Sequence, residues 1–218
     1  MAARLATFLF DLDGTLIDSI DLILASYRHT MLTHRGQAPA DDFWLPGLGT
    51  PLTSQFRLLA DDEAEIEAMV RTYRAYNLAN HDARVCAYPG VRDAVVHLAE
   101  RGARLGIVTS KLRAGALRGL SLCRYDALFE IVVGSDDVTQ HKPDPEPVLK
   151  ALDLLGAAAT ATVFVGDSPH DMAAGKAAGV MTAAALWGPF PRTTLEPLSP
   201  DFWLTSPADL ATLIDRDR

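Results

Sequence analysis

The chain has 218 residues, of which 49% are hydrophobic and 22% charged, so it can form one large globular domain or one domain carrying an insertion. No apolar stretch approaches the length of a membrane span, and acidic residues end the first apolar run too early for a signal peptide, so we expect a cytoplasmic protein. The formal net charge of -8, without any run of Lys and Arg, argues against nucleic acid as a partner but still permits a small anionic substrate beside a bound cation.

The first predicted element is a short buried strand over residues 7–10, which runs directly into Asp11-Leu12-Asp13-Gly14-Thr15. In isolation such a stretch is most typical of a surface turn, because Asp and Gly both favour turns. Buried strands seldom end in two carboxylates, so the alternative is a catalytic strand end. Three later stretches of the chain favour this second interpretation.

Three helices are predicted next, with no strand between them. The first covers residues 18–34 with Asp18 or Ser19 as its N-cap, and a turn-rich loop leads to a second helix over residues 52–60. The third covers residues 62 to about 81, because acidic residues stand at its start and an apolar stripe that includes Tyr73 follows. Tyr27 belongs to the apolar positions of the first helix. This part of the chain therefore predicts an all-helical insertion.

Strands and helices alternate after residue 88. Apolar runs predict strands over residues 104–109, 131–134, 162–166, 181–186 and 202–204. Helices are predicted over residues 91–100, 113–121, 145–155, 170–178 and 207–214. This alternation predicts a mostly parallel sheet with helices on both faces, in which ligands bind outside the carboxyl ends of the strands.

The two cysteines, Cys86 and Cys123, are far apart and in no metal-like spacing. This arrangement favours two buried free thiols over a disulfide or a zinc site.

Three later stretches place polar side chains near predicted strand ends. Thr109 and Ser110 end one strand, Lys142 precedes a rigid Pro-x-Pro segment, and Asp167 and Asp171 follow another strand. Each stretch alone has an ordinary interpretation, as turn formers, a surface lysine or helix caps. Because the carboxyl ends of parallel strands share one edge of a sheet, together they bring carboxylates, hydroxyls and one ammonium to a single site. This set is typical of phosphoryl transfer, in which carboxylates hold Mg²⁺ and the other groups stabilise phosphoryl charge.

These stretches give the chain a specific resemblance to a known family. It resembles the haloacid dehalogenase (HAD) superfamily phosphatases, with residues 11–15 as motif one, Thr109 as motif two, Lys142 as motif three and residues 166–171 as motif four. The resemblance implies an α/β fold with a Rossmann-like HAD core, whose parallel sheet is flanked by helices, at residues 1–16 and 84–218. An inserted all-helical cap of type 1 would occupy residues 17–83. Within the superfamily, the chain is most similar to the phosphoglycolate phosphatase branch and its bacterial pyrophosphatase relatives of the PpaX type.

The resemblance also implies roles for the acids. Asp11 is expected to be the nucleophile that forms an aspartyl-phosphate, and Asp13 the general acid and base. Mg²⁺ would be held by Asp11, by the main-chain carbonyl of Asp13 and by Asp167, with Asp171 in a supporting position behind these ligands.

The phosphoryl oxygens would be bound by Thr109, Ser110 and Lys142. Ser110 stands where many phosphoglycolate phosphatases have asparagine, so only Thr109 and Lys142 follow the family pattern here. Substrate specificity in such enzymes lies in the cap. The cap candidates for binding a substrate carboxylate or second phosphate are residues 47–50, Arg57, Arg71, Arg74 and Arg84.

Single residues distinguish this chain from members of the superfamily with other activities. A haloacid dehalogenase typically has tyrosine at the position of Asp13, and a phosphonatase needs a cap lysine, which residues 18–82 do not contain. A β-phosphoglucomutase usually has an apolar residue at the position of Thr15, so hydrolysis is preferred to phosphoryl return. A non-catalytic binding protein on the same scaffold is disfavoured because both motif-one aspartates are present.

We therefore expect a phosphohydrolase acting on a small phosphorylated metabolite, with phosphoglycolate or pyrophosphate as the preferred substrates. Phosphoryl transfer like that of β-phosphoglucomutase and a non-catalytic binding role stay open as alternatives, as does the choice between a monomer and a homodimer. The cap is expected to open and close over the core, with hinges at residues 17–20 and 80–86.

Overall fold

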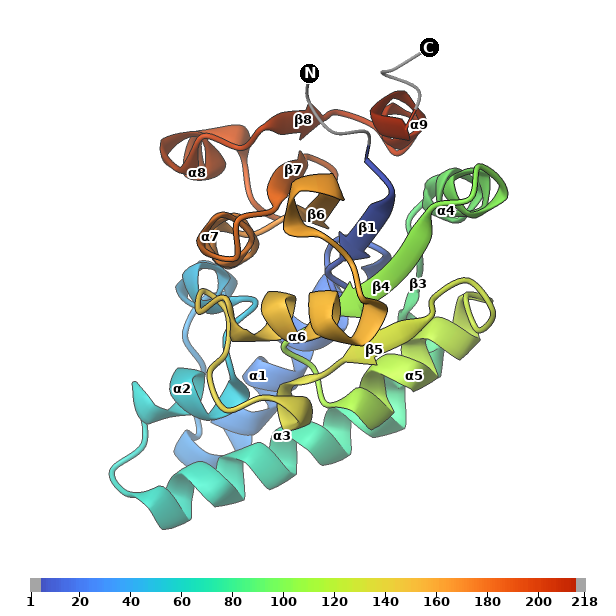
Figure 1. Ribbon diagram of the computed structural model, residues 1–218. Helices are drawn as coiled ribbons and strands as arrows, with labels where there is room; N and C mark the ends of the chain where they lie inside the picture. The colour runs from blue at the N-terminus through green and yellow to red at the C-terminus, as the bar shows by residue number, and fades with distance from the viewer. Residues whose placement is uncertain (1–4, 215–218) are drawn as a thin grey trace.

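The structure is a computed structural model that describes residues 5–214. A central parallel sheet organises it. Its strand order is β5-β4-β1-β6-β7-β8 (Figure 1). The strands are β1 (Thr7–Phe10), β4 (Arg104–Val108), β5 (Ile131–Val133), β6 (Thr162–Gly166), β7 (Met181–Ala185) and β8 (Phe202–Leu204). The predicted parallel sheet is therefore confirmed, with three of its strands ending one residue earlier than expected.

Strand β1 lies at the centre because both of its faces are apolar. Phe8, Leu9 and Phe10 are fully buried, as expected for a strand covered on both sides. Phe8 and Phe10 pack toward α4, α5 and α9, whereas Leu9 packs toward α6 and α7. The covering helices are α4 (Val91–Glu100), α5 (Arg113–Leu122), α6 (Glu146–Leu155), α7 (Pro169–Ala177), α8 (Arg192–Leu195) and α9 (Asp209–Ile214).

Residues 20–84 contribute a separate group of helices, which Figure 1 shows below the sheet. They are α1 (Ile20–Arg35), α2 (Leu52–Arg57) and α3 (Glu63–Arg84), with short 3-10 turns η1 (Asp41–Phe43) and η2 (Leu45–Gly47) between the first two. Aromatic rings hold the group together, since Tyr27 stacks on the buried Trp44 with ring centroids 4.2 Å apart. The same apolar cluster continues into Phe190 and Leu195 of the other part of the chain. This all-helical group is called the cap below.

A short antiparallel pair, β2 (Ile17–Asp18) and β3 (Cys86–Ala87), joins the cap to the rest of the molecule. Two-residue strands show no periodicity, so the sequence did not predict them. Beside this pair, the Arg118 guanidinium on α5 donates to both carboxylate oxygens of Asp82 on α3, at 2.8 and 2.9 Å. The proposed boundaries of the cap at residues 17–83 fall at this connection, and they stay a prediction.

Three local expectations were wrong. Helix α9 begins at Asp209 rather than residue 207, because the Asp209 carboxylate accepts hydrogen bonds from the backbone of Thr205 and Ser206 and closes a turn there. Helix α8 was not expected at all. Both cysteines are free thiols, but Cys86 is exposed and only Cys123 is buried.

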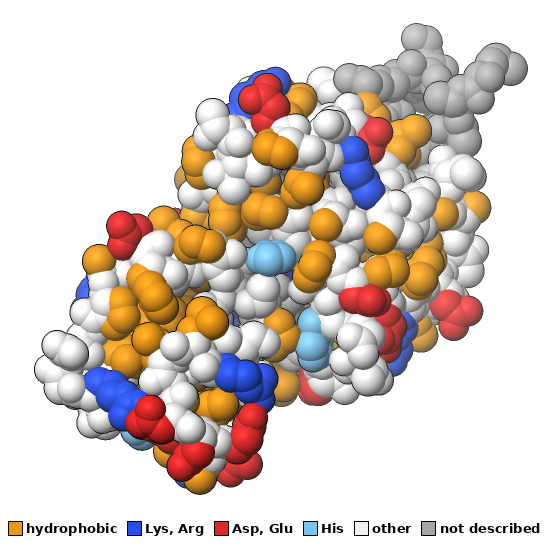
Figure 2. Space-filling view, turned by 90° about the vertical axis from the view of Figure 1, so that its left-hand side faces the viewer, with side chains coloured by type: hydrophobic (Ala, Val, Ile, Leu, Met, Phe, Trp, Pro, Cys, Tyr) orange, Lys and Arg blue, Asp and Glu red, His pale blue; other side chains and the backbone are white. Residues whose placement is uncertain are grey.

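Between residues 5 and 214, no helix is both long and apolar enough to cross a bilayer. On the face shown in Figure 2, Lys and Arg side chains are scattered among Asp and Glu side chains and form no continuous basic patch.

Candidate active site

The predicted motifs meet at the carboxyl ends of three adjacent strands. Asp11 directly follows β1, Thr109 follows β4, and Asp167 follows β6. All three side chains are buried, at 4%, 4% and 2% exposure. This placement results from the parallel register, in which the neighbours of the central strand end at the same edge.

Lys142 lies behind Asp11 and connects two of the acids. Its Nζ is 2.9 Å from Asp11 Oδ1 and 2.6 Å from Asp171 Oδ1, and the side chain is almost fully buried. Burial alone would lower the pKa of Lys142, but the two carboxylates outweigh it and raise that pKa. The ammonium therefore stays charged.

Three buried carboxylates nevertheless share this single ammonium. Oxygens of Asp11, Asp167 and Asp171 lie within 4.8 Å of one another. Burial raises the pKa of Asp11 to about 7 against the opposing effect of Lys142, and burial with the charges of Asp171 and Asp11 raises the pKa of Asp167 well above its usual range. Clustered oxygen donors with uncompensated negative charge fit a hard divalent cation such as Mg²⁺.

The three acids differ in how many of their oxygens are already engaged. Asp171 uses both, since Oδ1 accepts from Lys142 and Oδ2 accepts from the N–H and hydroxyl of Ser168, at 3.0 and 2.6 Å. Asp167 Oδ1 accepts from the Thr15 hydroxyl at 2.6 Å. This pattern suits Asp11 and Asp167 as direct ligands and Asp171 as a support for Lys142 and the β6–α7 turn.

Two glycines fix the position of Asp167. A Cβ added at Gly14, where φ is +89°, would lie 2.7 Å from Asp167 Oδ2, and a Cβ at Gly188 would lie 2.4 Å from Asp167 Cβ. The neighbouring Trp187 donates from Nε1 to the carbonyl of Thr15 at 2.9 Å. The loops after β1 and β7 thus enclose this carboxylate closely.

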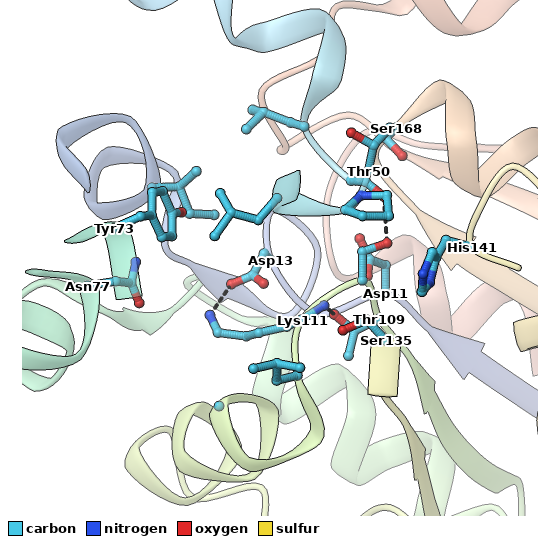
Figure 3. A pocket seen from close by; sticks show the side chains of 18 of the residues that line it. Asp11, Asp13, Thr50, Tyr73, Asn77, Thr109, Lys111, Ser135, His141 and Ser168 are labelled. Atoms are coloured by element: carbon cyan, nitrogen blue, oxygen red, sulfur yellow. Dashed lines mark hydrogen bonds and ion pairs between the residues drawn. The ribbon is translucent and has the colours of Figure 1, made fainter. Parts of the chain in front are cut away.

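Asp13 lies in a different environment from Asp11. Its Oδ1 accepts from Ser19 Oγ at 2.6 Å. The same oxygen accepts from Lys111 Nζ at 2.8 Å (Figure 3). Burial would raise the pKa of Asp13, but the Lys111 charge and the two hydrogen bonds outweigh it and lower that pKa. Ser19 is the N-cap residue of α1, as one of two predicted options, yet its hydroxyl serves Asp13 rather than the helix.

The cap contacts the core beside these acids. The Ser110 hydroxyl donates to the carbonyl of Gly49 at 2.5 Å, and its contact with a phosphoryl oxygen stays a prediction. His170 Nε2 lies 3.3 Å from the carbonyl of Pro46. In this structure the loop between η2 and α2 therefore lies on the strand ends.

A cavity of about 470 Å³ remains between the cap and the strand ends. Of the predicted site residues, Asp11, Asp13, Thr109, Ser110 and Asp167 line it, whereas Lys142 and Asp171 lie behind its wall.

The four cap arginines differ in their relation to this cavity. Arg57, Arg71 and Arg84 are paired with Glu63, Glu67 and Asp21, and only Arg74 among the four lines the cavity.

Sequence reasoning missed several cavity residues. Lys111 follows motif two by two positions, but nothing local showed that its ammonium would reach Asp13. Tyr27 and Tyr73 were interpreted as parts of apolar helix stripes, and they line the cavity from the cap. The one signal for a cavity was that tyrosine carries a hydroxyl, which needs a hydrogen-bond partner or water even where the ring lies on an apolar stripe.

Comparison with known proteins gives consistent matches over nearly the whole chain. A family model described as "Haloacid dehalogenase-like hydrolase" matches residues 8–185. A protein named pyrophosphatase PpaX from Anoxybacillus flavithermus is 42% identical over 208 residues, covering 95% of this chain and 96% of the relative. One of the same name from Bacillus cereus strain G9842 is 40% identical over 211 residues, covering 97% of each.

Solved structures agree with these sequence matches. A putative haloacid dehalogenase-like hydrolase from Bacteroides fragilis has a TM-score of 0.89 at 29% identity, covering 95% of this chain and all of the other. A putative phosphoglycolate phosphatase from Lactobacillus plantarum has a TM-score of 0.87 at 26% identity, covering 97% of this chain and all of the other.

Proposed function

Since this chain belongs to the haloacid dehalogenase-like hydrolases, we propose that it is a Mg²⁺-dependent phosphatase that acts on a small phosphorylated metabolite through an aspartyl-phosphate. The main support is the position of Asp11, whose carboxylate follows the central strand, lines the cavity and belongs to an acid cluster that fits a cation.

In the first step, a carboxylate oxygen of Asp11 forms a bond to phosphorus while the bond from phosphorus to the leaving-group oxygen breaks. Asp13 protonates that leaving oxygen. The Thr109 hydroxyl binds a phosphoryl oxygen from the neighbouring strand end. Lys142, fixed between Asp11 and Asp171, keeps a positive charge behind the reacting carboxylate.

In the second step, Asp13 takes a proton from a water that attacks the phosphorus of the aspartyl-phosphate. The bond between phosphorus and the Asp11 oxygen breaks, and inorganic phosphate leaves. This division of roles follows the positions of the two acids in motif one. Asp13 is held by Lys111 and Ser19, and Asp11 by Lys142.

Asp11, Asp167 and the main-chain carbonyl of Asp13 are the groups that would hold Mg²⁺. When bound, this cation neutralises negative charge on the phosphoryl group and on the carboxylates that face it. Asp171 supports the arrangement through its bonds to Lys142 and Ser168.

Pyrophosphate and phosphoglycolate are the substrates that we propose. The relatives from A. flavithermus and B. cereus carry the name of a pyrophosphatase, and the L. plantarum neighbour that of a putative phosphoglycolate phosphatase. Both molecules combine the reacting phosphoryl group with a second anionic group.

The test is phosphate release at neutral pH with Mg²⁺ from phosphoglycolate, pyrophosphate and β-glucose 1-phosphate in parallel, with Asp11→Asn as the control. Hydrolysis of either of the first two, abolished by Asp11→Asn, supports the proposal and names the substrate. Formation of glucose 6-phosphate without hydrolysis would instead establish a mutase. Hydrolysis that persists in Asp11→Asn would rule out Asp11 as the nucleophile.

A further inference from the structure

The cavity extends well past the reacting carboxylate. In Figure 3, Asp11 and Thr109 lie at one side, Tyr73 and Asn77 lie at the other, and Lys111 with Asp13 lies between them. If the proposed function holds, a phosphoryl group at Asp11 directs its leaving group past Lys111 toward helix α3. The far wall of the cavity is therefore where a leaving group would be recognised.

Two tyrosine hydroxyls on this cap wall have no partner. Tyr27 is 4% exposed and lines the cavity, as does Tyr73. Neither hydroxyl makes a hydrogen bond to any residue between 5 and 214. Neither hydroxyl is among the buried polar atoms that lack a partner, so both are accessible from the cavity and free to bind a ligand there. Stacking of Tyr27 on Trp44 holds its ring in place.

Positive charge accompanies these hydroxyls. Lys111 lines the middle of the cavity, and Arg74 of α3 lines its cap side. Arg74 has no carboxylate partner in the described part of the chain, whereas Arg71, one turn earlier on the same helix, pairs with Glu67 at 3.7 Å and lies outside the cavity. The cap residues that line the described cavity include no Asp or Glu. This side of the cavity thus combines hydrogen-bond donors with positive charge and lacks opposing carboxylates.

We propose that Arg74, Tyr27 and Tyr73 of the cap, with Lys111 of the core, form a subsite for a second anionic group on the substrate's leaving group. A guanidinium, two phenol hydroxyls and an ammonium are all donors, as a carboxylate or phosphate requires. Lys111 has three N–H donors and can bind this anion while one of them stays on Asp13. A substrate without the second anion would leave the donors unsatisfied, so the subsite selects its substrates by charge.

Ethyl phosphate provides a matched probe, because it has the shape of phosphoglycolate with a methyl in place of the carboxylate. The measured quantity is the ratio of kcat/KM for phosphoglycolate, and for pyrophosphate, over kcat/KM for ethyl phosphate. Arg74→Gln should lower this ratio by about tenfold to a hundredfold, the usual effect of losing a charged hydrogen bond. Tyr27→Phe and Tyr73→Phe should lower it by a smaller factor, and Arg71→Gln should leave it unchanged.

The two anionic substrates identify which second anion the subsite binds. In Arg74→Gln, only the substrate whose second anion fits the subsite should lose its whole kcat/KM advantage over ethyl phosphate. A ratio that is the same in Arg74→Gln as in the wild type would overturn the subsite.

Binding to the Asp11→Asn variant separates this inference from the proposed function, because it requires no turnover. Calorimetry should give tighter binding of phosphoglycolate or pyrophosphate than of ethyl phosphate, with the difference lost when Arg74→Gln is added. Equal affinities for all three ligands would overturn the subsite even if the enzyme is a phosphatase. Preferential binding with no hydrolysis by the wild type would keep the subsite and reject the catalytic proposal.

Discussion

Asp11 and Asp13 are two residues apart, yet the protein gives them opposite electrostatic surroundings. Burial raises the pKa of Asp11 to about 7, whereas Lys111 and Ser19 lower the pKa of Asp13 despite its burial. The chain turns directly after Asp13, at Gly14, where φ is +89°. The two carboxyl groups therefore differ in how readily they lose a proton.

The raised pKa of Asp11 predicts how the stability of the metal-free protein changes with pH. An acid whose pKa is higher in the folded than in the unfolded state stabilises the fold at low pH, and this contribution is lost as pH rises toward the folded pKa of about 7. As the pH rises from 5 to 8, the free energy of unfolding of Asp11→Asn should rise by roughly 2 kcal/mol relative to that of the wild type. Urea denaturation in EDTA measures this difference, and a difference that does not change with pH would contradict it.

Gly188→Ala should disturb the metal site although residue 188 bears no functional group. The added Cβ would lie 2.4 Å from Asp167 Cβ and 2.7 Å from the Gly14 carbonyl oxygen, so Asp167 or the loop must move. We expect the free energy of unfolding to fall by about 1–3 kcal/mol, together with a loss of phosphatase activity of tenfold or more. Thermal denaturation and kinetics check this, and an unchanged Tm would show that the loop after β7 can move aside without loss of stability.

The sequence was sufficient to locate the acids, Thr109 and Lys142, because each stands in a motif beside a strand end. It was insufficient for contacts made at long range. Lys111 and Asp13 are 98 positions apart, and no local pattern links them. Helical periodicity placed Tyr27 and Tyr73 on apolar stripes, but periodicity cannot tell whether a stripe faces a solid core or a cavity.

Most helices and strands followed from ordinary local signals. Apolar runs marked the strands of the sheet, and a capping residue with an apolar stripe marked α3, which begins one residue after Asp62. Two elements that the sequence did not predict lie where such signals are absent. The β2–β3 pair has only two residues in each strand, and α8 has four residues, so neither is long enough to show a period.

The N-cap of α3 gives a test at the scale of one helix. The Asp62 carboxylate accepts a hydrogen bond from the N–H of Glu65 at 2.8 Å. Asp62→Ala should therefore lower the free energy of unfolding by about 1 kcal/mol, measured by urea denaturation. The matched control is Asp61→Ala, which removes an exposed ion pair with Arg35 and should cost less. Equal losses of unfolding free energy in the two variants would show that the N-cap hydrogen bond of Asp62 contributes no more than an exposed ion pair.

At the scale of the molecule, the cap is held to the core at two separate places. Near the cavity, Ser110 binds Gly49 and His170 lies beside Pro46. At the connection, the β2–β3 pair and the ion pair of Arg118 with Asp82 join the two parts. The predicted hinges at residues 17–20 and 80–86 fall at this second place. Movement there would break the contacts near the cavity and the apolar contacts with Phe190 and Leu195.

We expect the cap to open around that connection when no ligand is bound. Small-angle scattering should give a larger radius of gyration without ligand than with Mg²⁺ and a tetrahedral phosphate analogue such as tungstate. Ser110→Ala, which removes the bond to Gly49, should shift the unliganded protein further toward the open form. Crystals with and without the analogue that show the same cap position would count against this motion.

Cys86 lies on β3 opposite Asp18, at the connection about which the cap is expected to turn. It is exposed, whereas the other cysteine, Cys123, is buried and burial raises its thiol pKa to about 11. The natural chain therefore presents a single reactive thiol at its own joint. A maleimide fluorophore or spin label attached there would report cap movement in the unmodified sequence, without any engineered attachment point.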